Sequence, residues 1–133
     1  MGNATVRWAG GKQFIGTDST RHSVVLSTPD EGVGMKPSEL LLVALASCTA
    51  VDVVEILAKK RLHLDSLEIS ANAQQDQDPP WAFRKIHLTY RLKGVDLSDK
   101  DVKQAIDLSE QNYCSVAATL RGVTEITTSF EIM

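Results

Sequence analysis

The sequence predicts an α+β fold, in which three strands precede one long helix and strands and shorter helices share the rest of the chain. Short segments of alternating apolar and polar residues, bounded by glycine and proline, are typical of strands. One long stretch of helical periodicity, from about Pro37 to Arg61, is typical of a central helix. No linker, repeat or low-complexity segment interrupts the chain, so we predict a single domain over residues 1–133.

The first predicted elements form a small antiparallel sheet. Residues 4–9 alternate as a strand, and residues 13–17 form the returning strand. Between them, Gly10-Gly11 can adopt the positive φ angles of a tight hairpin turn. A third strand follows over residues 22–28, and residues 29–34 are rich in turn formers.

The long helix is the most apolar part of the sequence. Pro37 suits a first helical turn, Ser38 offers a capping oxygen, and Glu39 interacts favourably with the positive end of the helix. Residues 40–46 are apolar on every face, so we expect this part to be buried all round. A domain of this size cannot cover such a helix by itself. Sheet or a second subunit must wrap it.

Two longer strands and two helices are predicted in the second half of the chain. Residues 65–75 and 84–93 alternate as strands, and the second carries four large apolar residues on one face: Ile86, Leu88, Tyr90 and Leu92. A capping box of Ser98 and Asp101 opens a helix over residues 99–111.

The last predicted helix carries the second cysteine. It runs from about Asn112 to Leu120 and is closed by Gly122. Residues 124–133 alternate as a final strand. The predicted order is therefore three strands, a helix, two strands, two helices and a strand.

Composition excludes several functional classes. The net charge of −3 gives no electrostatic reason to expect nucleic acid or an anionic membrane as a partner. The sequence shows no secretory signal pattern, and its longest uninterrupted apolar run is too short to span a bilayer. We therefore expect a cytoplasmic protein. Cytosolic reductants keep thiols reduced, so the two cysteines are either packing residues or redox-active groups.

The two cysteines have different local settings. Cys48 lies in the middle of the long helix, with Asp52 and Glu55 at helical spacing, where a cysteine often only packs. Asp52 is either a structural hydrogen-bonding group or a residue that faces a partner subunit, and we expect the structural role. Cys114 lies in the first turn of the last helix if Asn112 is its cap, and there the helix dipole favours a thiolate. Position alone therefore predicts the lower pKa for Cys114.

No metal site is predicted. The three histidines, His22, His63 and His87, are scattered, and none has metal-ligand spacing from another ligand-type residue. The sequence contains no Cys-x-x-Cys pair.

Two stretches, KPSELLLVALASCTAVDVVEIL and SEQNYCSVAATL, resemble the OsmC/Ohr family of osmotically induced and organic-hydroperoxide-resistance proteins, and look closest to its YhfA-like branch. The upstream GGK hairpin and the order of elements also match. The resemblance implies an OsmC-like fold, with a long central helix wrapped by antiparallel sheet, in an intertwined homodimer.

The resemblance also implies an activity. The family's thiol-dependent peroxidases reduce small organic hydroperoxides, and their roles map here to Cys48, which attacks the peroxide, and Cys114, which resolves the sulfenic acid into a disulfide. No metal or organic cofactor is implied. Electrons come from an external dithiol reductant, such as a lipoylated or thioredoxin-like protein.

The family activates its attacking thiol with a cation, because burial in an apolar pocket raises a thiol pKa. That cation is an arginine from the N-terminal hairpin, oriented by a glutamate directly after the proline. Here Ser38 follows the proline and Lys12 stands at the arginine position. We therefore take Lys12 or Arg21 as the candidate cation and Glu39 as the candidate orienting carboxylate.

Two other functions remain open. The same fold can serve as a non-catalytic module that binds a small apolar ligand. It can also serve as a redox sensor that oxidises once without turnover. Peroxide consumption coupled to thiol loss separates an enzyme from the binding module, and repeated turnover with a dithiol excludes the sensor.

Overall fold

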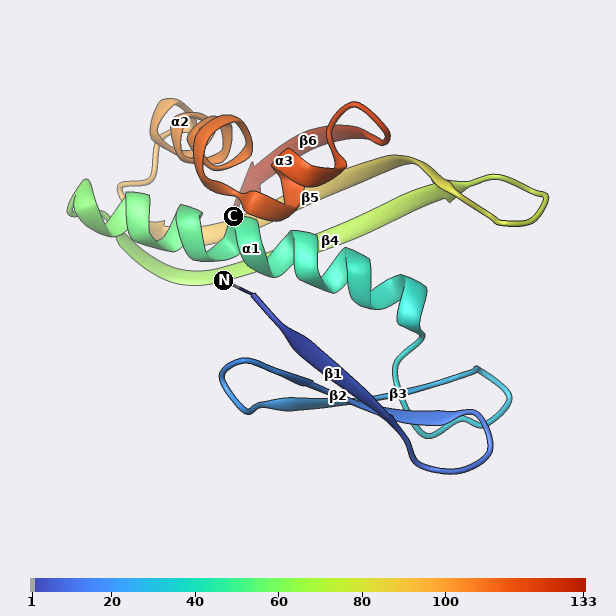
Figure 1. The fold of residues 1–133 in the computed structure, drawn as a ribbon. Coiled ribbons are helices and arrows are strands. Elements are labelled where there is room, and N and C mark those ends of the chain that lie inside the picture. The colour runs from blue at the N-terminus through green and yellow to red at the C-terminus, as the bar shows by residue number, and fades with distance from the viewer. Residues whose placement is uncertain (1) are drawn as a thin grey trace. The chain divides into compact units, whose positions relative to one another are not determined.

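The computed structural model describes residues 2–133. The backbone divides into an N-terminal unit that ends at Leu41 and a C-terminal unit from Leu42 to Met133 (Figure 1). The elements in chain order are β1 (Ala4–Trp8), β2 (Gln13–Asp18), β3 (Ser23–Ser27), α1 (Pro37–Lys59), β4 (His63–Gln75), β5 (Phe83–Val95), α2 (Asp99–Leu108), the π-helical turn η1 (Ser109–Tyr113), α3 (Ser115–Leu120) and β6 (Glu125–Ile132). The predicted α+β class and order of elements are confirmed.

The N-terminal unit is an antiparallel sheet in the order β1-β2-β3. Gly10 and Gly11 form the first turn with φ angles of 100° and 54°, as predicted for the hairpin. The loop that follows β3 is held against this turn, because the Lys12 amide donates a hydrogen bond to Glu31 Oε1 at 3.0 Å. The strand boundaries differ from the predicted ones by one residue at most.

The C-terminal unit contains a sheet in the order β4-β5-β6. β4 and β5 are antiparallel, but β5 and β6 are parallel, with Ile86 beside Ile126. The expectation of a wholly antiparallel sheet is therefore wrong for the last strand. α2, η1 and α3 together form the crossover that a parallel connection requires.

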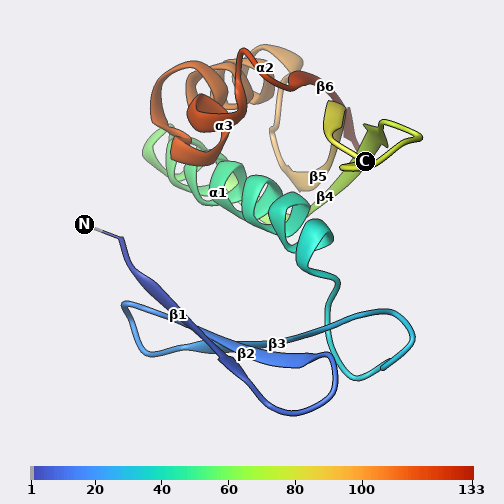
Figure 2. The ribbon, with the colours of Figure 1, turned by 45° about the vertical axis from the view of Figure 1, so that its right-hand side comes forward.

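One apolar core holds the C-terminal unit together. Figures 1 and 2 show α1 and the α2–α3 segment on the same side of the sheet. The predicted inner face of β5 is fully buried there, together with Leu45, Val53 and Leu57 of α1 and Val102, Ala105 and Ile106 of α2. Burying each such side chain stabilises the fold by about 1.5–3 kcal/mol.

α1 is buried on one face only in the single chain. Val43, Val51 and Val54 on its other face are 47%, 57% and 46% exposed. The single chain by itself therefore does not bury residues 40–46 all round, because its core covers only one side of the helix. The expected cover by a second subunit stays a prediction.

The length and composition of α1 also correct the expectation about membranes. It has 23 residues, and its most apolar 18-residue window has a mean hydropathy of 2.2, so by these measures it is able to cross a bilayer. The uninterrupted apolar run is shorter than the helix, because polar residues interrupt the apolar sequence of α1. Core helices of globular domains have the same length and composition, and Leu45, Val53 and Leu57 pack in this core.

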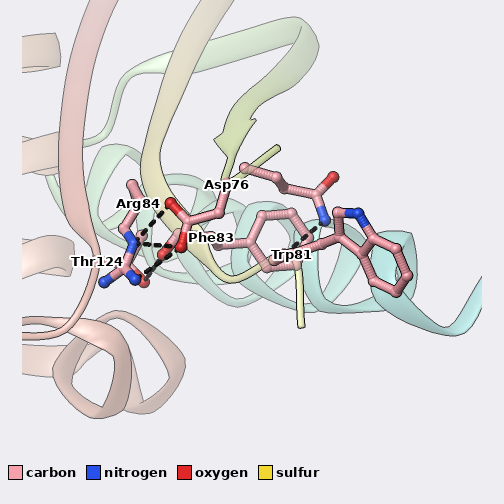
Figure 3. Close-up of polar contacts among 6 residues, drawn as sticks. Asp76, Trp81, Phe83, Arg84 and Thr124 are labelled. Carbon is pink, nitrogen blue, oxygen red and sulfur yellow. Dashed lines mark hydrogen bonds and ion pairs between the residues drawn. The ribbon is translucent and has the colours of Figure 1, made fainter. Parts of the chain in front are cut away.

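The β4–β5 hairpin is fixed by polar contacts around its turn (Figure 3). Arg84 binds Asp76 through two nitrogens, with Nη2 2.7 Å from Oδ2. Gln75 Nε2 donates to the Trp81 carbonyl at 3.0 Å, and Thr124 Oγ1 donates to the Phe83 carbonyl at 3.0 Å. The last contact ties the start of β6 to β5 and so helps to set the register of the parallel pair.

Candidate functional site

Cys114 is itself the N-cap of α3. Its backbone is extended, with φ −76° and ψ 107°, and its Sγ accepts the Ala117 amide hydrogen at 3.4 Å. The prediction that Asn112 caps this helix is wrong, because Asn112 lies within η1. A π-helical turn adds a residue to the helical repeat, and no local sequence pattern marks it.

The structure brings the two cysteines together. Cys48 is half-buried on α1, and its Sγ lies 4.0 Å from the hydroxyl of Ser115, the first residue of α3. The thiols of Cys48 and Cys114 lie near enough for each to shift the pKa of the other, and both are reduced. The attacking and resolving thiols named by the resemblance are therefore neighbours within the C-terminal unit.

The two thiols have opposite electrostatic settings. Burial by itself raises the pKa of Cys48. Hydrogen bonds from the Cys114 thiol, the Val116 amide and Ser115 outweigh that effect and bring the pKa below its ordinary value. Burial and, next in size, the neighbouring Cys48 thiol raise the pKa of Cys114 to about 11.

This asymmetry reverses the expectation drawn from helix position. Cys114 does occupy the N-terminus of a helix, but it is only 2% exposed, and burial together with the neighbouring Cys48 keeps its thiol protonated. The amides of α3 instead serve Cys48, which approaches that turn from α1. Cys48 is therefore the more acidic of the two thiols.

A chain of hydrogen-bonded hydroxyl groups links α1 to β5 and to the π-helical turn before Cys114. Ser109 Oγ donates to Asp52 Oδ2 at 2.7 Å and lies 3.0 Å from Thr49 Oγ1, which lies 2.8 Å from the Tyr90 hydroxyl. Ser109, Thr49 and Tyr90 are fully buried. The expected structural role of Asp52 is confirmed, because this carboxylate accepts the hydrogen bond that ends the chain.

A cavity of about 510 Å³ opens on the Asp52 side of α1. Its walls combine an apolar surface from Ile56, Leu108 and Tyr113 with the charges of Asp52, Glu55 and two lysines. Across residues 2–133, no group of three or more histidine, cysteine or acidic side chains is arranged to hold a metal ion.

A family model described as OsmC-like protein matches residues 28–129. The chain belongs to the OsmC-like family. It is 34% identical to protein YhfA of Escherichia coli K12 over 130 residues, which cover 98% of this chain and 97% of YhfA.

Solved structures share the OsmC-like fold. A hypothetical protein from Aquifex aeolicus VF5 is 28% identical, with a TM-score of 0.90 over 100% of this chain and 96% of that one. The organic hydroperoxide resistance protein OhrB of Bacillus subtilis is 17% identical, with a TM-score of 0.66 over 98% of both chains. At that identity, the likeness to OhrB shows the fold alone.

The three predicted activating residues lie in the N-terminal unit. Lys12 Nζ lies 3.1 Å from Asp30 Oδ2, and Glu39 lies 3.7 Å from Lys36 Nζ. Arg21 occupies a turn with a positive φ of 68°. Within residues 2–133, no ion pair joins Glu39 to either candidate cation. Their roles toward Cys48 stay predictions.

Sequence reasoning missed Ser109, Ser115 and Thr49 as parts of the site. Thr49 carried a usable signal, because it interrupts an otherwise apolar stripe of α1 formed by Leu45, Val53 and Leu57. A polar residue at such a position needs a buried hydrogen-bond partner. Ser109 and Ser115 carried no comparable signal, because the π-helical turn sets their positions.

Proposed function

We propose that this OsmC-like chain is a thiol-dependent peroxidase that reduces small organic hydroperoxides through a two-cysteine cycle. One observation carries the proposal: Cys48 Sγ lies 4.0 Å from the hydroxyl of Ser115, the first residue of the helix that Cys114 caps, so the two thiols are neighbours. The lowered pKa of Cys48 and the raised pKa of Cys114 fit an attacking and a resolving thiol. Attack on an O–O bond requires a thiolate, and resolution requires a second thiol within bonding reach.

The first step oxidises Cys48. Its thiolate attacks one peroxide oxygen, the O–O bond breaks, and the alkoxide leaves and takes up a proton to become an alcohol. The sulfur then carries a hydroxyl group, as a sulfenic acid. In the resting protein, the Cys114 thiol, the Ser115 hydroxyl and the Val116 amide stabilise the attacking charge. Lys12 or Arg21, oriented by Glu39, is our candidate for an additional cation.

The second step forms the disulfide. Once Cys48 is a neutral sulfenic acid, the negative charge that raised the pKa of Cys114 is gone. Cys114 then gives up its proton more readily, attacks the Cys48 sulfur and releases the hydroxyl group as water. Two thiols have been oxidised, and one hydroperoxide has been reduced to alcohol and water.

An external dithiol completes the cycle by thiol–disulfide exchange. A lipoylated or thioredoxin-like protein provides the chemistry required. A cytoplasmic location fits this proposal, because reductants there keep both thiols reduced between turnovers. The proposal includes neither nucleic acid nor a membrane as a partner.

We also propose a homodimer, in which a second copy of the chain covers the exposed face of α1. The apolar side chains on that face of the C-terminal unit, Val43, Val51 and Val54, have no cover in the single chain. A groove of about 300 Å³ between Val43 of α1 and Leu67 and Ile69 of β4 extends this apolar surface.

The proposed activity is tested by following hydroperoxide loss with a dithiol present in excess. Wild type should consume many equivalents of cumene hydroperoxide per chain, and Cys48→Ser should consume none. Loss of only one equivalent favours the redox sensor. If neither single cysteine variant differs from wild type in peroxide loss, a non-catalytic binding protein replaces the enzyme.

A further inference from the structure

Ser109 connects the two cysteine-bearing segments. Its hydroxyl contacts Asp52 and Thr49 of α1, and its carbonyl accepts the Cys114 amide hydrogen at 2.7 Å. Thr49 directly follows Cys48, and Asp52 lies one helical turn further on. One fully buried residue therefore joins the surroundings of the first thiol to the backbone of the second.

The connection runs through the π-helical turn. The bond from the Cys114 amide to the Ser109 carbonyl spans five residues and ends η1, so it fixes where α3 begins. Such turns are uncommon in proteins, and those that do occur are frequently found at functional sites. Without an anchor on α1, the turn is free to relax to the ordinary helical repeat. Cys114 would then rotate away from Cys48, because an α-helix turns about 100° per residue.

The geometry points to Ser109 as a positioning residue that holds the Cys114 thiol against Cys48 for disulfide formation. Ser109 touches neither sulfur, and it acts through the backbone of η1 and the cap of α3. This inference rests on the proposed two-cysteine cycle. Its physical content, the encounter of two thiols, is measurable without any peroxide.

The main test compares Ser109→Ala with wild type in a glutathione redox buffer. The ratio of oxidised to reduced Cys48–Cys114 pair gives the effective concentration of one thiol at the other. We expect a decrease of tenfold or more in Ser109→Ala, because the turn has lost both contacts to α1. Ser109→Thr, which keeps the hydroxyl, should recover most of the loss.

Ser27→Ala is the matched control for a general loss of stability. Ser27 is also a fully buried serine, and its hydroxyl binds the Gly34 amide at 3.0 Å within the N-terminal unit. This variant should lose stability without changing the effective concentration. An equal decrease in Ser27→Ala, or none in Ser109→Ala, overturns the inference.

A second variant guards against misfolding of Ser109→Ala. Asp52→Asn keeps an acceptor for Ser109 but removes its charge, so it should weaken the anchor and give an intermediate decrease. A value equal to that of wild type argues against the anchor.

Single-turnover kinetics link the inference to the proposed activity. After one equivalent of hydroperoxide, Ser109→Ala should accumulate a Cys48 sulfenic acid that dimedone traps, whereas wild type should proceed to the disulfide. If wild type itself consumes no peroxide, the proposed function fails, and the glutathione measurement still decides the role of Ser109.

Discussion

Removing the Cys114 thiol should raise the pKa of Cys48. In the native site, the neighbouring Cys114 thiol acts as a donor that lowers the pKa of Cys48 and helps to offset the effect of burial. Cys114→Ala removes the donor, and Cys114→Ser replaces it with a hydroxyl of similar size. The two variants therefore differ mainly in whether a donor faces the thiolate.

The size of the effect follows from the strength of one hydrogen bond to a charged group. Such a bond contributes roughly 1.5–3 kcal/mol, and one pKa unit corresponds to about 1.4 kcal/mol. A thiol is a weak donor, so the lower end applies, and we expect a rise of about 1 unit in Cys114→Ala. Donors from α3, at Ser115 and Val116, remain in both variants.

The assay is the pH dependence of alkylation by iodoacetamide, whose rate follows the thiolate fraction. Cys48 is the only thiol in either variant, because the chain has two cysteines. Cys114→Ser should titrate near or below wild type and Cys114→Ala about one unit higher. Equal midpoints in the two variants would refute the role of the second thiol in activating the first.

Three further predictions follow from the fold and the site. Val51→Glu places a charge on the exposed apolar face of α1 and should convert the proposed dimer to monomers, as measured by light scattering. The control Val95→Glu should leave the dimer intact, and a monomeric wild type would contradict the dimer. Cumene hydroperoxide should react faster than hydrogen peroxide, since each buried CH₂ contributes about 0.8 kcal/mol, and equal rates would remove the argument for an apolar substrate site. Because the pKa of Cys114 is raised to about 11, the folded state binds more protons than the unfolded state above about pH 9. Stability to urea should therefore fall between about pH 9 and 11. In Cys114→Ser the fall should be smaller and begin only near about pH 10, where Tyr90, whose pKa is also raised by burial, starts to contribute.

The parts of the fold that depend on local patterns were predictable. The alternation of Ile86, Leu88, Tyr90 and Leu92 gave the buried face of β5, because side chains on a strand alternate between its faces. The capping box at Ser98 was equally local, and its hydroxyl accepts the Asp101 amide hydrogen at 3.2 Å. The parallel pairing of β6 was not predictable, because strand direction depends on contacts distant in the sequence.

The candidate site was predictable only in part. The two cysteine motifs together indicated a pair, although no spacing rule joins residues so far apart in the sequence. Which thiol carries the charge depends on burial and on donors from another segment, so the local rule gave the wrong answer for Cys114. The anchor at Ser109 depends on a π-helical turn, which leaves no mark in the hydrophobic pattern.

The most direct test of the central claim is mass spectrometry of Cys114→Ser after one equivalent of cumene hydroperoxide in the presence of dimedone. The account predicts one equivalent of peroxide consumed and one dimedone adduct on Cys48, while wild type forms the Cys48–Cys114 disulfide instead. An unmodified Cys48 after full exposure to the peroxide would contradict the account.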